Sequence, residues 1–260
     1  MMKLIILVLF ILLSALSINA QTDSLRLIDT LTIKTHESQN QWYRSRYIQE
    51  SIVPVSLALG SLTIVAIPGF KEDLQKRFVW NNDQLPGYVN LGDDYVRYVP
   101  AVAEYALSAF GLKSKHHFID RSVILAVAYI ASDFVVYNGK KITKSPRPGG
   151  RTTSSDGYSL PSQHTAMSFV AATFLDHELG YISPWISIGG YLTAGYVGYA
   201  RIVRNAHWTS DVLMGAGVGI LMTNATYWAY DGVMKLFPKN LTITPIIDPN
   251  QTGIYFCYKL

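Results

Sequence analysis

The chain has 260 residues, enough for one large domain with a sizeable core. Apolar residues make up 49% of it and charged residues 15%, against roughly 25% charged in ordinary soluble domains. This balance favours a membrane protein or an unusually apolar helical one, and a net charge of +4 is too small to indicate a nucleic-acid partner. The single cysteine, Cys257, excludes an intramolecular disulfide and a cysteine-rich zinc site.

The N-terminus has the pattern of an export signal. Lys3 precedes an apolar run, residues 4–13, that is too short to span a bilayer comfortably. Ala20 ends the segment, and Gln21 rather than cysteine follows it, which argues against a lipoprotein anchor. We therefore predict a signal peptide at residues 1–20 and a polar N-terminal segment at residues 21–50.

Six apolar runs predict an all-α helical bundle over residues 51–236. The expected helices are residues 52–67, 95–112, 122–137, 164–179, 186–200 and 212–230. Only residues 51–69 and 212–230 approach the roughly 20 apolar residues that a membrane span requires. The composition favours a membrane-embedded bundle with its charged residues turned inward, and a soluble bundle with a thick core is the alternative.

The connections and the tail are more polar. Residues 71–90 are expected to be irregular, and residues 113–121 form a charged connection in which His116 and His117 are expected to be solvated, because adjacent residues do not face each other on a helix. Residues 139–158 read as a basic loop rich in Gly, Pro and Ser. The tail, residues 237–260, alternates on both sides of a turn-rich stretch and predicts a short C-terminal β-hairpin.

Three short patterns carry candidate chemistry, and the last of them, RIVRNAHWTSD, stands before the apolar run 212–230. A carboxylate one turn from an imidazole can hold the ring in one tautomer, so Asp211 would orient His207 as a nucleophile. Arg201 would add a permanent planar charge for a phosphate. The alternative is a helix-capping acid beside a packed loop histidine.

The first pattern, KKITKSPRP, contains Lys140 and Arg147. Both side chains supply hydrogen-bond donors and no acceptors, which suits a phosphate oxyanion. Pro148 biases Arg147 toward an extended backbone, which favours a loop position. The alternative is a basic surface loop near acidic lipid head groups.

The middle pattern is Pro161-Ser162-Gln163-His164, followed by an apolar helix. Ser162 is a candidate N-cap, which would direct the N–H groups of Gln163 and His164 toward an anion. His164 could then give a proton to a leaving oxygen. The alternative is a capped helix with an exposed histidine.

Together these patterns resemble the motifs K-x6-RP, PSGH and SR-x5-H-x3-D of the type 2 phosphatidic acid phosphatase and haloperoxidase superfamily. The resemblance covers about residues 122–230. It implies an α-helical bundle, hydrolysis through a phosphohistidine without metal or cofactor, and often lipid phosphate substrates. Gln163 replaces the usual glycine and Ala200 the usual serine; neither change removes a charged or proton-transferring group, so activity is expected to persist.

The expected function is hydrolysis of a lipid phosphate monoester or pyrophosphate at the periplasmic side of a bacterial envelope, with the membrane and the lipid as partners and no nucleic acid. Phosphatidic acid, phosphatidylglycerol phosphate, undecaprenyl pyrophosphate and lipid A phosphates are candidate substrates, and residues 88–97 are a candidate rim of the substrate mouth. Two alternatives stay open: a vanadium-dependent haloperoxidase, and a non-catalytic lipid-binding or structural membrane protein, which Gln163 supports best. The predicted catalytic residues are His207, His164 and Asp211, and the predicted phosphate-binding residues are Lys140, Arg147, Ser162, Gln163 and Arg201.

Overall fold

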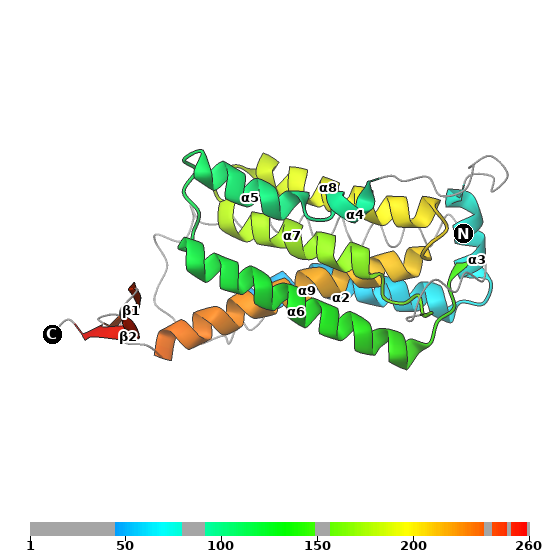
Figure 1. The fold of residues 1–260 in the computed structure, drawn as a ribbon. Coiled ribbons are helices and arrows are strands. Elements are labelled where there is room, and N and C mark those ends of the chain that lie inside the picture. Colours follow the sequence, from blue (N-terminus) through cyan, green and yellow to red (C-terminus); the bar gives the residue numbers. More distant parts are fainter. Residues whose placement is uncertain (1–44, 80–91, 149–156, 237–240, 249–250, 259–260) are drawn as a thin grey trace, which may run out of the picture. The chain divides into compact units, whose positions relative to one another are not determined.

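Helices make up most of the described part of the chain. The computed structural model describes residues 45–79, 92–148, 157–236, 241–248 and 251–258. Its helices are α2 (Arg46–Ala66), α3 (Phe70–Phe78), α4 (Asp93–Val96), α5 (Val99–Ala109), α6 (Phe118–Thr143), α7 (Gln163–Leu179), α8 (Pro184–Val203) and α9 (Thr209–Leu236) (Figure 1). The all-α class is confirmed. The predicted signal peptide, residues 1–20, and residues 21–44 of the polar segment lie outside the described ranges.

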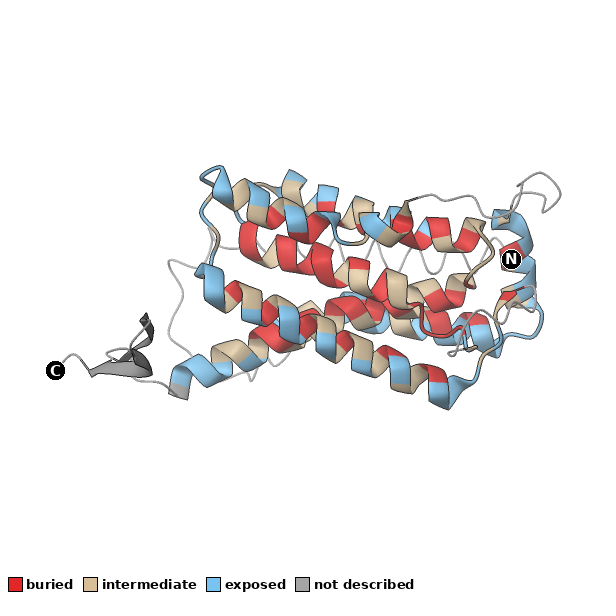
Figure 2. Ribbon diagram, viewed as in Figure 1, coloured by how far each residue is buried: buried red, intermediate tan, exposed pale blue. Residues whose placement is uncertain are grey.

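Helix α7 is the most buried helix of the bundle (Figure 2). It contacts α5, α6, α8 and α9, which together surround it. Phe174 of α7 packs in a core cluster with Ile124 of α6 and Tyr227 of α9. Because α7 is surrounded, its first turn is held in a fixed position at one end of the bundle.

Glycines allow α9 to approach its neighbours closely. A Cβ atom on Gly217 would lie 2.7 Å from the carbonyl oxygen of Pro54 in α2. One on Gly219 would lie 2.9 Å from Cβ of Phe169 in α7, and closer still to the carbonyl oxygen of Ala166. Small residues at such contacts let two helix backbones come together, so α9 lies tightly against both α2 and α7.

Several predicted boundaries are wrong for identifiable physical reasons. The expected helix over residues 95–112 is divided into α4 and α5, because Pro100 has no N–H to bond to a preceding turn. Helix α3 forms in the segment expected to be irregular. Glu72 and Asp73 lie in its first turn and Lys76 and Arg77 in its last, an order that complements the helix dipole. Helix α6 extends to Thr143, so Lys140 lies on a helix and not in the following loop.

The expectation that both adjacent histidines are solvated is wrong for one of them. His116 is partly buried, and its Nδ1 lies 2.7 Å from Oε1 of the buried Glu178. His117 is exposed and is the N-cap residue of α6. A buried carboxylate at the end of α7 needs a partner, and this need decides the place of His116.

Many large apolar side chains point outward from the bundle. They include Leu59 of α2, Val102 of α5, Ile130 of α6 and Leu192 of α8, all of them exposed. Within the described residues, α2 is the one helix that is both long and apolar enough to cross a membrane. An apolar outer surface of this extent is characteristic of a membrane or protein contact rather than of a water-exposed surface.

Two strands follow α9 in sequence. β1 (Leu241–Asp248) and β2 (Gln251–Tyr258) pair antiparallel, with Leu241 opposite Tyr258 and Asp248 opposite Gln251. Only the backbone of this pair is described.

Candidate active site

The N-terminal ends of α7 and α9 meet, and this brings together two of the three patterns. The N–H of Ser162 donates to the carbonyl oxygen of Asp211 at 3.0 Å. Gly215, one turn into α9, makes this approach possible, because a Cβ atom there would lie 2.5 Å from the carbonyl oxygen of Ser162. The residues around positions 162 and 211 are therefore neighbours in space.

The imidazole of His207 is buried between a cation and a carboxylate. Its Nε2 lies 3.3 Å from Nη1 of Arg147, and its Nδ1 lies 3.4 Å from Oδ2 of Asp211. Only 1% of His207 is exposed, and Asp211 is fully buried. Since a guanidinium can only donate, these partners favour the tautomer with the proton on Nδ1 and a lone pair on Nε2.

Ser159 is a third partner of His207, one that the sequence did not indicate. Its hydroxyl donates to Oδ2 of Asp211 and lies 3.3 Å from Nδ1 of His207. A separation of 3.4 Å is long for a hydrogen bond between His207 and Asp211, so Ser159 bridges the two groups. Ser159 precedes the middle pattern by two residues, and no local feature of the sequence marks it.

Burial controls the charge of His207. Removal of the ring from water is the main reason that its pKa falls from 6.5 to about 4. The positive charges of Arg147 and Arg201 also lower this pKa, whereas Asp211 raises it. The imidazole is therefore neutral at pH 7. A neutral ring with an available lone pair is the form in which histidine acts as a nucleophile.

The short helix α4 meets the residues expected to contact a phosphate. Nε2 of His164 lies 2.7 Å from Oδ1 of Asp94. The fully buried Asp93 accepts from Nη1 of Arg201 at 3.0 Å and from Nη2 of Arg204 at 2.5 Å. Asp93 and Asp94 belong to the predicted rim of the substrate mouth, residues 88–97. Residues 88–91 of this rim lie outside the described ranges. The pairing of the two carboxylates with residues of the site was not predicted.

Asp93, Asp94 and His164 form the one group of candidate metal ligands found among the described residues. Their ligand atoms lie within 4.8 Å of one another. Arg201 and Arg204, however, both donate to Asp93, so a dication there would lie beside two guanidinium groups. The donor set fits an ion-pair network better than a metal site.

The first pattern reaches the same end of the bundle. Lys140 is buried in the last turn of α6. The same turn packs against the start of α7: a Cβ atom on Gly139 would lie 3.0 Å from Cδ of Pro161, and the hydroxyl of Thr143 donates to the carbonyl of Leu160 at 2.9 Å. Arg147 donates to the carbonyl oxygen of Ala206 at 3.1 Å, next to His207.

The start of α7 agrees with the predicted cap only in part. Ser162 is the N-cap residue, with an extended backbone, but its hydroxyl caps no N–H and instead accepts from the hydroxyl of Thr165 at 3.0 Å. The side chain of Gln163 donates to Oδ1 of Asp133 at 2.5 Å. Gln163 is therefore held toward α6. The first amides of a helix have no partner within it and remain suited to an anion.

Comparison with known protein families gives a match over part of the chain. A model of the PAP2 superfamily matches residues 121–235, a range that includes all three patterns. The match confirms the resemblance carried by these patterns: this segment is similar to the PAP2 superfamily.

Among individual proteins, the lipid A 1-phosphatase of Porphyromonas gingivalis is 37% identical over 144 residues, which are 55% of this chain and 32% of that relative. The chain thus matches about a third of that relative's length. Two solved structures are also similar. Aquifex aeolicus LpxE has a TM-score of 0.44 and 22% identity, with coverage of 60% of this chain and 94% of that one. A transmembrane PAP2-type phosphatidylglycerolphosphate phosphatase from Bacillus subtilis has a TM-score of 0.47 and 18% identity, with coverage of 72% and 98%.

Proposed function

We propose that the protein is a phosphatase of lipid phosphates that works through a phosphohistidine on His207. The observation that carries this proposal is the environment of the ring: Nδ1 lies against Ser159 and Asp211, and Nε2 lies 3.3 Å from Arg147. A phosphoryl group bound by that guanidinium would lie next to the nucleophilic nitrogen. The PAP2 match and the lipid A 1-phosphatase relative support the same class of reaction.

In the first step, the lone pair on Nε2 of His207 forms a bond to phosphorus. The bond from phosphorus to the leaving oxygen breaks, and a proton from His164 passes to that oxygen. The proton on Nδ1 stays with His207, where Asp211 stabilises the positive charge that develops on the ring. Lys140, Arg147 and Arg201 are proposed to neutralise the phosphoryl oxygens, with further donors from Ser162 and the first amides of α7.

In the second step, water attacks phosphorus and His164 accepts one of its protons. The bond between phosphorus and His207 breaks, and inorganic phosphate leaves. All the groups in this scheme are side chains or amides of the chain itself, so the proposal requires no metal or cofactor.

The proposed acid role of His164 depends on the substrate. Without substrate, burial and the nearby Arg201 and Arg97 lower the pKa of His164 to about 4. A bound phosphate is negatively charged and would offset both arginines, which raises the pKa of the ring. His164 would therefore be protonated together with substrate binding, and the phosphate would take the place of the Asp94 carboxylate beside it.

The apolar surface supports a membrane location. We propose that α2 lies in a membrane, that residues 1–20 direct export, and that the site faces the periplasm of a bacterial cell. Among phosphatidic acid, phosphatidylglycerol phosphate, undecaprenyl pyrophosphate and lipid A phosphates, the relative from Porphyromonas gingivalis makes the 1-phosphate of lipid A the first substrate to test.

The test is phosphate release by the purified protein in detergent from these four lipids. We expect wild-type protein to hydrolyse at least one of them and His207→Ala to lose about 10³-fold or more in rate, as removal of a nucleophile does. His117→Ala is the matched control, since this histidine is exposed and outside the site, and it should retain activity. Full activity of His207→Ala, or no release from any lipid by wild-type protein, would overturn the proposal.

A further inference from the structure

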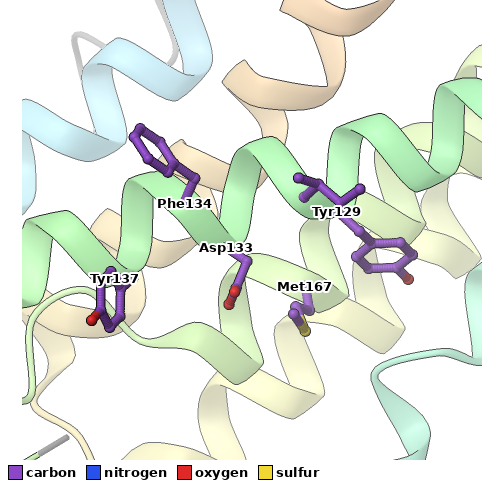
Figure 3. Close-up of a pocket in the computed structure, with 6 residues that line it drawn as sticks. Tyr129, Asp133, Phe134, Tyr137 and Met167 are labelled. Atoms are coloured by element: carbon purple, nitrogen blue, oxygen red, sulfur yellow. The ribbon is translucent and has the colours of Figure 1, made fainter.

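An open hollow of about 450 Å³ lies on the surface of α6 where Met167 of α7 meets it, outside the group of residues assigned to phosphate chemistry. We call it the α6–α7 groove. In Figure 3, Tyr129, Asp133 and Tyr137 follow one another along α6, with Met167 of α7 beside them. The residues that line it are Tyr129, Ile130, Asp133, Phe134, Tyr137 and Met167. Its volume falls within the roughly 300–1,000 Å³ of small-molecule sites.

Two helix faces lead from the groove toward the candidate active site. Residues 133 and 140 are two turns apart on α6, so Asp133 and Lys140 share a face of that helix. Gln163 and Met167 are one turn apart on α7 and likewise share a face. The hydrogen bond from Gln163 to Asp133 joins these two faces, and Gln163 lies between Ser162 and His164 in the chain.

The chemistry of the groove changes along its length. Toward the outside, Ile130 and Phe134 are 69% and 68% exposed, and both are apolar. Asp133 is the one charged residue among the six that line the groove. A carboxylate on an otherwise apolar, outward-facing helix surface is costly in a membrane and normally marks a functional position.

We infer that the α6–α7 groove binds an acyl chain of the lipid substrate, and that the Asp133–Gln163 pair contacts the polar group joining that chain to the phosphate. The inference rests on the proposed function, because it assumes a lipid phosphate in the site. The carboxylate and the carboxamide oxygen are acceptors, so the pair selects a joining group with a hydroxyl or amide N–H donor. Gln163, which replaces the glycine of the family motif, becomes a specificity-determining residue in this scheme.

The first experiment narrows the groove. Ile130→Trp on α6 is compared with Leu192→Trp on α8, which is exposed to the same 69% and lies outside the groove. Both variants and the wild type are assayed on dioleoyl phosphatidic acid in mixed micelles and on water-soluble p-nitrophenyl phosphate. For Ile130→Trp we expect the ratio of lipid to soluble kcat/KM to fall about tenfold, mainly through KM, as changes of pocket size do. Leu192→Trp should keep the wild-type ratio.

The second experiment tests the polar pair. Asp133→Leu removes the carboxylate, and Asp133→Asn, which keeps an acceptor oxygen, is its conservative control. The substrates are lipid A 1-phosphate, which has hydroxyl and amide donors, and hexadecyl phosphate, which has none. The preference is the ratio of kcat/KM for lipid A 1-phosphate to kcat/KM for hexadecyl phosphate. We expect this ratio to fall about tenfold in Asp133→Leu, which is the order of effect of a lost polar contact to substrate. Asp133→Asn should keep most of the wild-type ratio.

The outcomes separate the two proposals. Wild-type activity on both substrate types, with an unchanged lipid-to-soluble ratio in Ile130→Trp, would overturn the groove and leave the phosphatase intact. An equal fall for Ile130→Trp and Leu192→Trp would overturn it as well, since the effect would then not depend on the groove. A wild-type protein that releases phosphate from neither substrate type would overturn the proposed function together with the groove. Circular dichroism of each variant confirms that the helices have formed.

Discussion

At the scale of single residues, the chemistry of the candidate site depends on how water is excluded from His207. The ring is buried with Asp211 and Ser159 on one side and Arg147 on the other. A buried carboxylate that loses a donor pays a desolvation cost, so each member of the group holds the others in place. Ser159 is the positioning residue, because its hydroxyl bonds to Asp211 and also reaches Nδ1 of His207.

Replacement of Ser159 by alanine should lower the rate with little effect on substrate binding. Loss of a hydrogen bond to a charged group costs about 1.5–3 kcal/mol, which corresponds to a kcat that is roughly 10- to 100-fold lower. Steady-state kinetics on the best lipid substrate provides the measurement. Ser168→Ala is the control. Ser168, which lies on α7, is fully buried like Ser159, but its hydroxyl has no hydrogen-bond partner among the described residues. Loss of this hydroxyl should leave kcat unchanged.

Stability should depend on pH through His207. The pKa of this ring is about 4 in the folded protein and near 6.5 when unfolded. As the pH falls below 6.5, the unfolded chain takes up a proton that the folded protein does not, so the free energy of unfolding decreases until the pH reaches about 4. Thermal unfolding at about pH 7.5 and about pH 5 should show a lower midpoint at the acidic pH, and a smaller loss in His207→Asn. An equal loss in the variant would contradict this origin.

At the scale of elements, two features place the site. The short helix α4 holds Asp93 against Arg201 and Arg204, and Asp94 against His164, so the cationic side of the site is neutralised by the chain itself when no substrate is present. Helix α9 carries glycines where it meets α2 and α7, and these contacts hold the first turn of α9 beside the first turn of α7. The distance between the two helices therefore sets the geometry of His207 and His164.

An added methyl group at the contact between α7 and α9 should destabilise the protein. Gly219→Ala places a Cβ against Phe169 and the carbonyl of Ala166, and overpacking of this kind typically costs about 1–3 kcal/mol. Gly189→Ala on α8 is the control, because a Cβ there meets nothing within 4 Å and alanine favours a helix by up to about 1 kcal/mol. The midpoint of thermal unfolding in detergent should fall for Gly219→Ala and stay equal or rise for Gly189→Ala.

At the scale of the whole molecule, polar and apolar surfaces are separated. The ionised network of α4 and the starts of α7 and α9 lie at one end of the bundle, whereas α2, α5, α6 and α8 present exposed apolar side chains along their lengths. A bilayer would cover the apolar surface and leave the polar end in reach of lipid head groups. This separation explains the low fraction of charged residues in the chain.

The protein is expected to behave as an integral membrane protein. After expression in a bacterium, it should remain in the membrane fraction through washes with high salt and with alkaline carbonate, because burial of apolar surface does not depend on ionic strength. Detergent should release it. Immunoblots of the fractions provide the measurement, and release by salt alone would indicate a peripheral protein held by charge.

Much of the helical fold could be predicted from the sequence, since apolar runs of 15 or more residues are longer than most strands and favour helices. Boundaries were harder. Helix α3 was missed because its sequence, FKEDLQKRF, has few apolar residues to reveal a helical period. Lys140 was assigned to a loop because Gly139 and a basic run follow the apolar stretch, although α6 continues through them to Thr143. His116 depends on Glu178, which lies 62 residues away.

By itself, the sequence determined the apolar class of the chain, most of its helices, and the spacing that puts His207 one helical turn from Asp211, because these are properties of neighbouring residues. The tertiary structure alone decided that Ser159 joins these two residues, that Asp93 and Asp94 meet Arg201 and His164, and that Gln163 turns toward Asp133. Each of those contacts joins residues 30 or more positions apart, and the one from Ser159 spans 48 positions to His207. Contacts over such separations form only when helix packing closes the chain on itself, and no local pattern encodes them.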